Sequence, residues 1–84
     1  MIKVILVDDH PVFVQGLQAL FAREEEITVM NTFTNGQDFF RYLSQQELPD
    51  VVLLDIEMTP LDGIMIAQNV LQLYPAVKVL MLST

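Results

Sequence analysis

The stretch Val51-Val52-Leu53-Leu54-Asp55 decides the fold that the sequence predicts. Its four apolar residues form a short, unbroken run of valine and leucine, which is typical of a strand buried on both faces of a parallel sheet. Asp55 then stands where the strand leaves the core, at its carboxyl end. Because ligands of open α/β sheets bind outside this end of the strands, Asp55 is the first candidate for a functional residue.

Two other apolar runs end in polar residues in the same way. Residues 2–7 lead directly into Asp8 and Asp9. Residues 77–82 lead into Ser83. Parallel strands place their carboxyl ends at one edge of the sheet, so that polar groups from separate parts of the sequence meet there. We therefore expect one rim of the sheet to carry Asp8, Asp9, Asp55 and Ser83.

Helical periodicity fills the segments between the strands. Apolar pairs at every fourth position predict a helix over residues 12–22, with one apolar face made of Val12, Phe13, Gly16, Leu17, Leu20 and Phe21. A shorter amphipathic helix is predicted around Phe39, Phe40 and Leu43. A third helix opens at Asp62-Gly63, with Asp62 as its N-cap, and its predicted apolar face consists of Ile64, Ala67, Val70, Leu71 and Tyr74.

The predicted elements follow the order β-α-β-α-β-α-β, with a weaker strand over residues 27–32, in one small domain of 84 residues. Short connections between alternating strands and helices imply an α/β fold with a parallel sheet and right-handed crossovers. The last predicted strand is apolar on both faces, yet no later segment of the sequence pairs with it or covers it. We therefore expect a C-terminally truncated chain whose exposed strand edge promotes self-association.

Composition excludes several classes of protein. The net charge of −7, with only four basic residues, argues against nucleic-acid binding by this segment, because phosphate contacts need cationic side chains. The absence of cysteine excludes a disulfide framework and a thiolate metal site. The apolar run before Asp8 is too short for a signal peptide or a membrane span, so we expect a soluble cytoplasmic protein without membrane contact.

The acidic rim suggests a metal-assisted reaction. Carboxylates on neighbouring strand ends repel one another unless a cation is present. Mg²⁺ suits such a rim, because it takes one or two carboxylates, keeps several waters and leaves positions for phosphate oxygens. A carboxylate beside the ion becomes a nucleophile toward phosphorus, which gives an aspartyl phosphate. An Asp-Asp pair after a strand is also common as a polar turn, and His10 in the same turn is interpreted as a solvated histidine.

Three motifs resemble the receiver domain of bacterial two-component response regulators: Val7-Asp8-Asp9-His10-Pro11-Val12-Phe13, Leu54-Asp55-Ile56-Glu57-Met58 with Asp62-Gly63, and Val79-Leu80-Met81-Leu82-Ser83. The Asp-Asp-His-Pro opening resembles the NarL/FixJ (LuxR-type) branch, whose receivers usually precede a helix-turn-helix DNA-binding domain. The resemblance implies a flavodoxin-like fold with strand order 2-1-3-4-5. Residues 1–84 would then form a partial receiver domain with order 2-1-3-4, without the final α-β-α elements and without a second domain.

The resemblance also implies the roles of the site residues. Asp55 would accept a phosphoryl group from a cognate histidine kinase, in a regulatory reaction rather than an enzymatic one. Mg²⁺ would be bound directly by Asp9 and largely through water by Asp8, and the other ligands would be Asp55 and the backbone carbonyl of Glu57. Ser83 would turn toward the phosphate and move the loop that follows, which switches the output of a DNA-binding regulator.

Two departures from the family pattern affect the site. Thr59 takes the place of a proline that usually follows the start of the phosphoacceptor loop, and Pro60 comes one residue later. The lysine that the family carries with its fifth strand has no counterpart, since neither Lys3 nor Lys78 matches it. We therefore expect this piece alone to bind Mg²⁺ weakly and to be phosphorylated poorly.

Two alternative functions fit parts of the sequence. The segment from Asp55 to Thr59 approximates the nucleophile loop of haloacid-dehalogenase-like phosphatases, but Glu57 stands where that family needs an aspartate as general acid. Turnover of a phosphate ester would identify such a phosphatase. The other alternative is a receiver-like binding module that is no longer phosphorylated, which the missing lysine favours and the acidic residues oppose.

Overall fold

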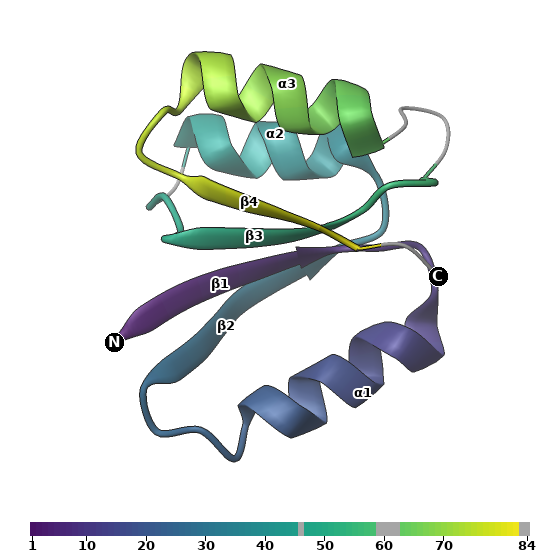
Figure 1. Ribbon diagram of the computed structural model, residues 1–84, viewed down its shortest axis with the longest axis vertical. Helices are drawn as coiled ribbons and strands as arrows, with labels where there is room; N and C mark the ends of the chain where they lie inside the picture. The colour runs from purple at the N-terminus through teal and green to yellow at the C-terminus, as the bar shows by residue number, and fades with distance from the viewer. Residues whose placement is uncertain (46, 59–62, 83–84) are drawn as a thin grey trace.

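The computed structural model describes residues 1–45, 47–58 and 63–82, along which strands and helices alternate (Figure 1). The strands are β1 (Ile2–Val7), β2 (Ile27–Phe33), β3 (Val51–Asp55) and β4 (Lys78–Leu82). The helices are α1 (Pro11–Phe21), α2 (Gly36–Gln45) and α3 (Gly63–Leu73). The predicted order of elements is confirmed, and strand boundaries differ from the predicted ones by one residue at most.

The strands form one parallel sheet with the order β2-β1-β3-β4. This order confirms the flavodoxin-like arrangement that the sequence resemblance implied. β1 is central, because Val7 pairs with Phe33 of β2 on one side and with Leu54 of β3 on the other. The residues that follow β1 therefore emerge beside the carboxyl end of β3.

Helices cover both faces of the sheet, with α1 on one face and both α2 and α3 on the other (Figure 1). Successive residues of a strand point to opposite faces. Ile5 and Val7 of β1 accordingly join the larger core beneath α2 and α3, whereas Val4 and Leu6 join the smaller core beneath α1. The larger core also contains Phe39, Leu43, Leu54, Met58 and Ile66, and the smaller core contains Val14 and Leu53.

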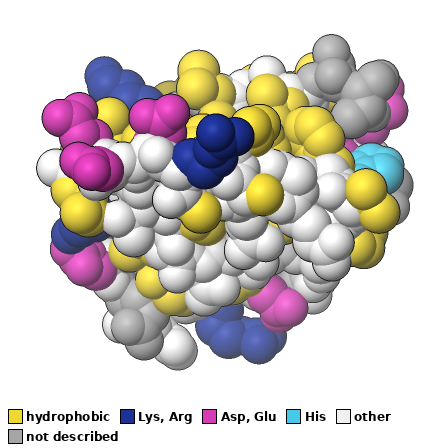
Figure 2. Space-filling model, turned by 90° about the horizontal axis from the view of Figure 1, so that it is seen from below, with side chains coloured by type: hydrophobic (Ala, Val, Ile, Leu, Met, Phe, Trp, Pro, Cys, Tyr) yellow, Lys and Arg dark blue, Asp and Glu magenta, His cyan; other side chains and the backbone are white. Residues whose placement is uncertain are grey.

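The face that α1 turns toward the sheet differs from the predicted face. Val14 is buried, and Leu17 and Phe21 pack against the smaller core. Val12, Leu20 and Phe13 are 82%, 60% and 36% exposed, so the prediction of one shared apolar face is wrong for them. Helical spacing does not distinguish the two sides of α1, because apolar residues also occur on the side that the sheet does not cover. Figure 2, viewed from below Figure 1, shows apolar side chains at the surface of this side of the molecule.

α3 also buries a different face from the predicted one. Ile66, which the prediction omitted, is fully buried. Ala67 and Tyr74 pack against the larger core as predicted. Ile64 and Leu71 are 52% and 55% exposed, which corrects their assignment to the buried face. Apolar residues occur on several sides of α3, so their spacing alone does not determine which side faces the sheet.

Within the described residues, β4 is an edge strand that pairs only with β3. Leu80 is 55% exposed and Met81 is 38% exposed. The prediction that the last strand presents uncovered apolar side chains is therefore confirmed for the part of the chain that the structure describes.

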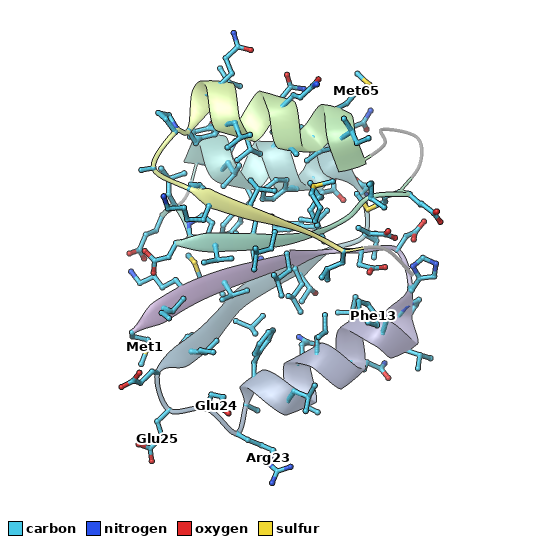
Figure 3. All side chains as sticks on the ribbon, in the orientation of Figure 1. Met1, Phe13, Arg23, Glu24, Glu25 and Met65 are labelled. Carbon is cyan, nitrogen blue, oxygen red and sulfur yellow. The ribbon has the colours of Figure 1, made fainter. Side chains whose placement is uncertain are left out.

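The turn between α1 and β2 is polar. It carries Arg23, Glu24 and Glu25, which are exposed and lie at the end of the molecule away from the carboxyl ends of the strands (Figure 3). Among the described residues, no helix has the length and the apolar character that crossing a membrane would require.

Candidate functional site

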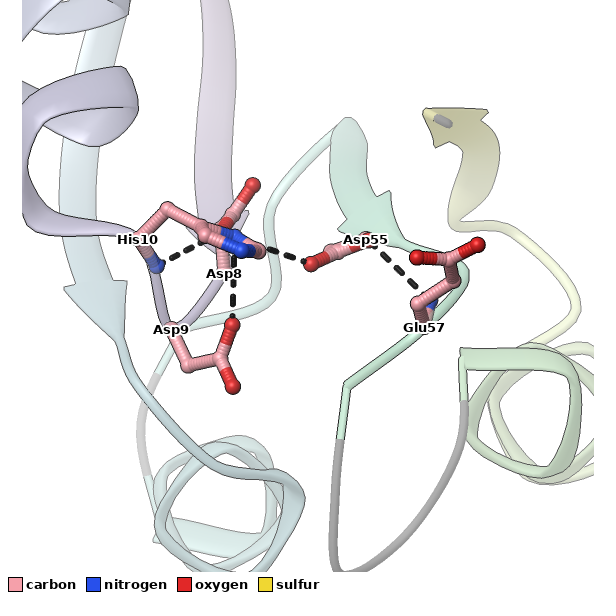
Figure 4. Close-up of polar contacts among 5 residues, drawn as sticks. All are labelled: Asp8, Asp9, His10, Asp55 and Glu57. Carbon is pink, nitrogen blue, oxygen red and sulfur yellow. Dashed lines mark hydrogen bonds and ion pairs between the residues drawn. The ribbon is translucent and has the colours of Figure 1, made fainter. Parts of the chain in front are cut away.

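The ends of β1 and β3 carry two carboxylates that are almost completely buried. Asp8 follows β1 and is 3% exposed, and Asp55 is the last residue of β3 and is 1% exposed. Figure 4 shows both side chains beside those of Asp9 and His10. Each of these four residues offers a donor atom within 4.8 Å of the others, so the structure brings the predicted carboxylates together. Ser83, the fourth predicted member of the rim, lies outside the described residues.

Asp8 is held by its backbone N–H and by one oxygen of its side chain. Its N–H donates to the carbonyl of Phe33 at the end of β2, with a distance of 3.0 Å. Its Oδ1 atom accepts the backbone N–H of His10 at 2.8 Å and lies 2.7 Å from the Nδ1 atom of the same residue. Its Oδ2 atom is buried and has no hydrogen-bond partner among the described residues. One oxygen of Asp8 is therefore fixed in the turn, and the other remains available to a ligand.

Asp55 shows the same division between its two oxygens. Oδ1 accepts the backbone N–H of Glu57 at 3.0 Å. Oδ2 is buried without a hydrogen-bond partner in the described part of the chain, and its ion-pair contact is with His10 Nδ1 at 3.3 Å. A buried carboxylate oxygen without a donor is unfavourable unless a cation or another ligand supplies the missing interaction.

The backbone after β3 is fixed by contacts with β4 and α3. Ile56 N–H donates to the carbonyl of Leu82 at 3.0 Å, and Gly63 N–H donates to the carbonyl of Ile56 at 3.1 Å. A Cβ atom on Gly63 would overlap the carbonyl oxygen of Asp55 and would lie 2.6 Å from Ile56 Cα. Glycine thus permits the close approach of α3 to the acidic rim. The N-cap predicted at Asp62 lies outside the described residues.

His10 keeps the exposed turn position that the sequence predicted, and its ring also contacts the three carboxylates. Its side chain is about half exposed, but Nδ1 lies 2.7 Å from Asp8 Oδ1, 3.2 Å from Asp9 Oδ1 and 3.3 Å from Asp55 Oδ2. The hydrogen bond to Asp8 raises the pKa of His10, the charges of all three aspartates raise it further, and partial desolvation opposes them. The position of His10 two residues after Asp8 is the sequence signal that could have identified it.

The donor set fits a divalent cation. The three carboxylates supply the hard oxygen ligands that Mg²⁺ prefers, and two of their buried oxygens lack hydrogen-bond partners among the described residues. Glu57 contributes its N–H to Asp55, whereas the role predicted for its backbone carbonyl stays a prediction. The geometry thus supports a metal site in which Asp8, Asp9 and Asp55 supply oxygen ligands.

The sequence and the fold are similar to those of known response regulators. The sequence matches the response regulator receiver domain over residues 4–84. It is 40% identical over 84 residues to the transcriptional regulatory protein LnrK of Bacillus subtilis, covering 100% of this chain and 38% of LnrK. A solved LuxR-family response regulator from Aurantimonas sp. has a TM-score of 0.87 and 25% identity, covering 99% of this chain and 59% of that one.

A structure of RcsB from Salmonella enterica serovar Typhimurium, bound to a promoter, shares the fold. Its TM-score is 0.89 at 22% identity, over 99% of this chain and 42% of that chain. The chain spans well under half the length of LnrK and RcsB. These matches do not favour the phosphatase alternative. The family match over residues 4–84, together with the 2-1-3-4 sheet, shows that the chain belongs to the receiver domains of two-component response regulators, with LuxR-type transcriptional regulators among its relatives.

Proposed function

We propose that this receiver domain accepts a phosphoryl group from a histidine kinase on Asp55, with Mg²⁺ bound beside it. The observation that carries the proposal is the Oδ2 atom of Asp55, a buried carboxylate oxygen without a hydrogen-bond partner in the described residues. Oδ1 accepts the N–H of Glu57, which fixes the orientation of the carboxylate. Asp8 and Asp9 supply the nearby negative charge that a metal ion would require.

The proposed reaction is one transfer for each Asp55 side chain. A carboxylate oxygen of Asp55 attacks the phosphorus of the phosphohistidine, an O–P bond forms, and the N–P bond to the kinase breaks. The electron pair of the broken bond returns to the imidazole nitrogen of the kinase. Phosphoryl transfer needs mainly positioning and charge neutralisation, which a rigid strand end and a metal site supply. The domain would act as a regulatory phosphoacceptor rather than as an enzyme with turnover.

Mg²⁺ would be held directly by Asp9 and Asp55, largely through water by Asp8, and by the backbone carbonyl of Glu57. The bound ion would neutralise negative charge on the carboxylate and on the phosphoryl oxygens. The burial of Asp8 and its hydrogen bonds to the His10 turn support a fixed, orienting role. Asp9 has a more accessible side chain, 37% exposed, which suits an ion that keeps several waters.

The output of the switch would lie in a longer regulator. Ser83 would donate a hydrogen bond to the phosphoryl group and couple phosphorylation to the following loop, as a bistable element biased by local charge. A DNA-binding domain in a cytoplasmic transcription factor is the expected target of that switch. Two observations support this output: LnrK is named a transcriptional regulatory protein, and RcsB has been solved on a promoter.

Intact-mass measurement before and after incubation with acetyl phosphate and Mg²⁺ tests the proposal. We expect one phosphoryl group to add to a minor fraction of this chain and to more of a longer chain that carries the lysine of the family. We expect no addition in Asp55→Asn or when a chelator replaces Mg²⁺. Glu25→Gln removes an exposed charge in the turn after α1 and should behave as the unmodified chain. An addition that persists in Asp55→Asn would contradict the assignment. Failure even in a longer chain that carries the lysine of the family would favour the non-phosphorylated binding module.

We further propose that the edge of β4 mediates self-association. Among the described residues β4 has a strand neighbour on one side, and Leu80 presents an apolar side chain that is 55% exposed. Unpaired strand edges with apolar side chains promote association. Sedimentation velocity should show oligomers that Leu80→Lys reduces. Leu71→Lys, at an equally exposed position on α3, is the matched control and should leave them unchanged. Equal effects of the two substitutions would exclude the β4 edge.

A further inference from the structure

We propose that His10 is a metal ligand of the acidic rim, and that its Nδ1 atom makes the site prefer borderline transition-metal ions such as Co²⁺ and Ni²⁺ over Mg²⁺. The inference rests on the proposed function only in placing a divalent cation between the ends of β1 and β3. It assigns a fourth side chain to that cation, and it changes the class of ion that the site selects.

The positions of the donor atoms carry the inference. Neighbouring ligands of an octahedral ion with bonds of about 2.1 Å lie about 3 Å apart. His10 Nδ1 lies 2.7, 3.2 and 3.3 Å from one carboxylate oxygen of each of the three aspartates. The nitrogen therefore stands at ligand spacing from Asp9 Oδ1 and Asp55 Oδ2, whereas its contact with Asp8 is with the oxygen that the turn already holds. Figure 4 shows the imidazole ring between these carboxylates.

The hydrogen bonds of the turn do not satisfy this group of atoms. Nδ1 can donate only one proton, and its shortest contact is with Oδ1 of Asp8. Asp8 Oδ2 and Asp55 Oδ2 remain buried without hydrogen-bond partners among the described residues. A cation bound between Asp8 and Asp55 would interact with several carboxylate oxygens at once, whereas one imidazole N–H donates to one of them. The two unpartnered oxygens thus indicate a cation that the imidazole alone does not replace.

The backbone holds His10 where its ring can reach the site. The N–H of His10 donates to Asp8 Oδ1 at 2.8 Å, and its carbonyl accepts the N–H of Val14 at 3.1 Å in the first turn of α1. Pro11 begins the helix directly after it, with its φ angle restricted by the ring. The residue is therefore anchored on both sides, and coordination requires only the tautomer that leaves Nδ1 without a proton.

Ligand chemistry then predicts a change in selectivity. Mg²⁺ prefers oxygen ligands and water, so an imidazole adds little to its binding. Co²⁺ and Ni²⁺ accept imidazole nitrogen readily and bind mixed nitrogen and oxygen sites more tightly than earlier ions of the series. Loss of the His10 nitrogen should consequently weaken Co²⁺ and Ni²⁺ binding while leaving Mg²⁺ binding largely unchanged.

Metal titrations of the untagged 84-residue chain test this difference, because a histidine tag would add imidazoles of its own. Affinities for Mg²⁺ and Co²⁺ are measured by calorimetry in the unmodified chain, in His10→Phe, which keeps a ring without a nitrogen, and in His10→Ala. We expect Co²⁺ affinity to fall about tenfold or more in both variants, which is the loss that substitutions at metal-binding sites typically cause. Mg²⁺ affinity should change much less. Asp55→Asn should weaken the binding of both ions, which separates the rim from adventitious sites.

NMR of the Co²⁺ complex provides a second readout that is independent of phosphorylation. The chain contains one histidine, so a strongly shifted imidazole proton in the complex can belong only to His10. The signal should appear with Co²⁺ and be absent in His10→Phe. Two results would overturn the role of His10 alone while leaving the metal site in place. One is a Co²⁺ complex without the shifted imidazole signal, although Mg²⁺ binds at the rim. The other is an equal loss of Mg²⁺ and Co²⁺ affinity in the His10 variants. Absence of binding by both ions, in this chain and in a longer chain that carries the lysine of the family, would overturn the metal site itself and with it the proposed function.

Discussion

Gly63 lies directly against the backbone of Asp55, so that a Cβ atom at residue 63 would overlap the carbonyl oxygen of Asp55 and would lie 2.6 Å from Ile56 Cα. The first residue of α3 and the end of β3 are therefore packed backbone to backbone. This contact, together with the hydrogen bond from Gly63 N–H to the carbonyl of Ile56, positions the proposed phosphoacceptor.

Gly63→Ala should destabilise the domain. The added methyl group must push α3 away from the end of β3, and overpacking of this kind costs about 1–3 kcal/mol. The free energy of unfolding in urea measures the loss. Gly16→Ala is the matched control, because a Cβ atom at residue 16 meets nothing within 4 Å and alanine favours a helix by roughly 0.5–1 kcal/mol. Equal shifts of the two variants would contradict the packing argument.

Three of the strands could be predicted from the sequence because each is a short apolar run that is followed by or ends in a polar residue. Such runs identify β1, β3 and β4, and together with the resemblance they predict the strand order and the convergence of Asp8 with Asp55. Helix faces were harder to predict, since α1 and α3 are apolar on more than one side. Ile64 and Ile66 illustrate the difficulty: both are apolar, but only the second is buried.

Substitutions at these two isoleucines should separate the buried and exposed sides of α3. Ile66→Ala removes a fully buried side chain from the larger core and should lower the free energy of unfolding by about 2–5 kcal/mol. Ile64→Ala changes a residue that is 52% exposed and should cost less than about 1 kcal/mol. Urea denaturation of both variants checks the prediction. A larger loss at residue 64 would restore the helix face that the sequence predicted.

The spacing of His10 from Asp8 predicts that it lies near the rim, but it does not determine the direction of its ring. The structure turns Nδ1 toward carboxylates from two separate strands, and Asp55 lies 45 residues from His10 in the sequence. Only the pairing of β1 with β3 creates that contact. The expectations for Ser83 and for Asp62 as an N-cap stay predictions, since both residues lie outside the described part of the chain.

In the metal-free domain, the contact with Asp8 should raise the pKa of His10. The pKa of His10 is raised above its ordinary value of 6.5, chiefly by the hydrogen bond to Asp8. The folded-state pKa then exceeds the unfolded one, so the stabilisation is fully present below about pH 6.5 and is lost as the pH rises through the raised pKa. Long-range ¹H–¹⁵N NMR spectra of this single histidine, recorded in chelator, follow the titration directly.

Asp8→Asn should lower the pKa of His10 toward its ordinary value, because it removes the charge of the principal hydrogen-bond acceptor. Asp38→Asn, at an exposed residue of α2, provides the control and should leave the titration unchanged. The same pKa in both variants would mean that the contact between Asp8 and His10 is not maintained in solution.

Asp55→Asn should stabilise the metal-free domain by about 1 kcal/mol, because it removes a buried charge whose Oδ2 atom lacks a hydrogen-bond partner among the described residues. The 3.3 Å contact with the half-exposed His10 offsets little of that cost. Mg²⁺ at about ten times its dissociation constant should then add about 1.4 kcal/mol to the unmodified domain, since it binds only the folded chain. The variant lacks a ligand and should gain less, so added Mg²⁺ should narrow or reverse the difference in urea midpoint. A difference that is independent of Mg²⁺ would show that the instability of Asp55 is not relieved by a metal ion, and its buried oxygen would then need another partner.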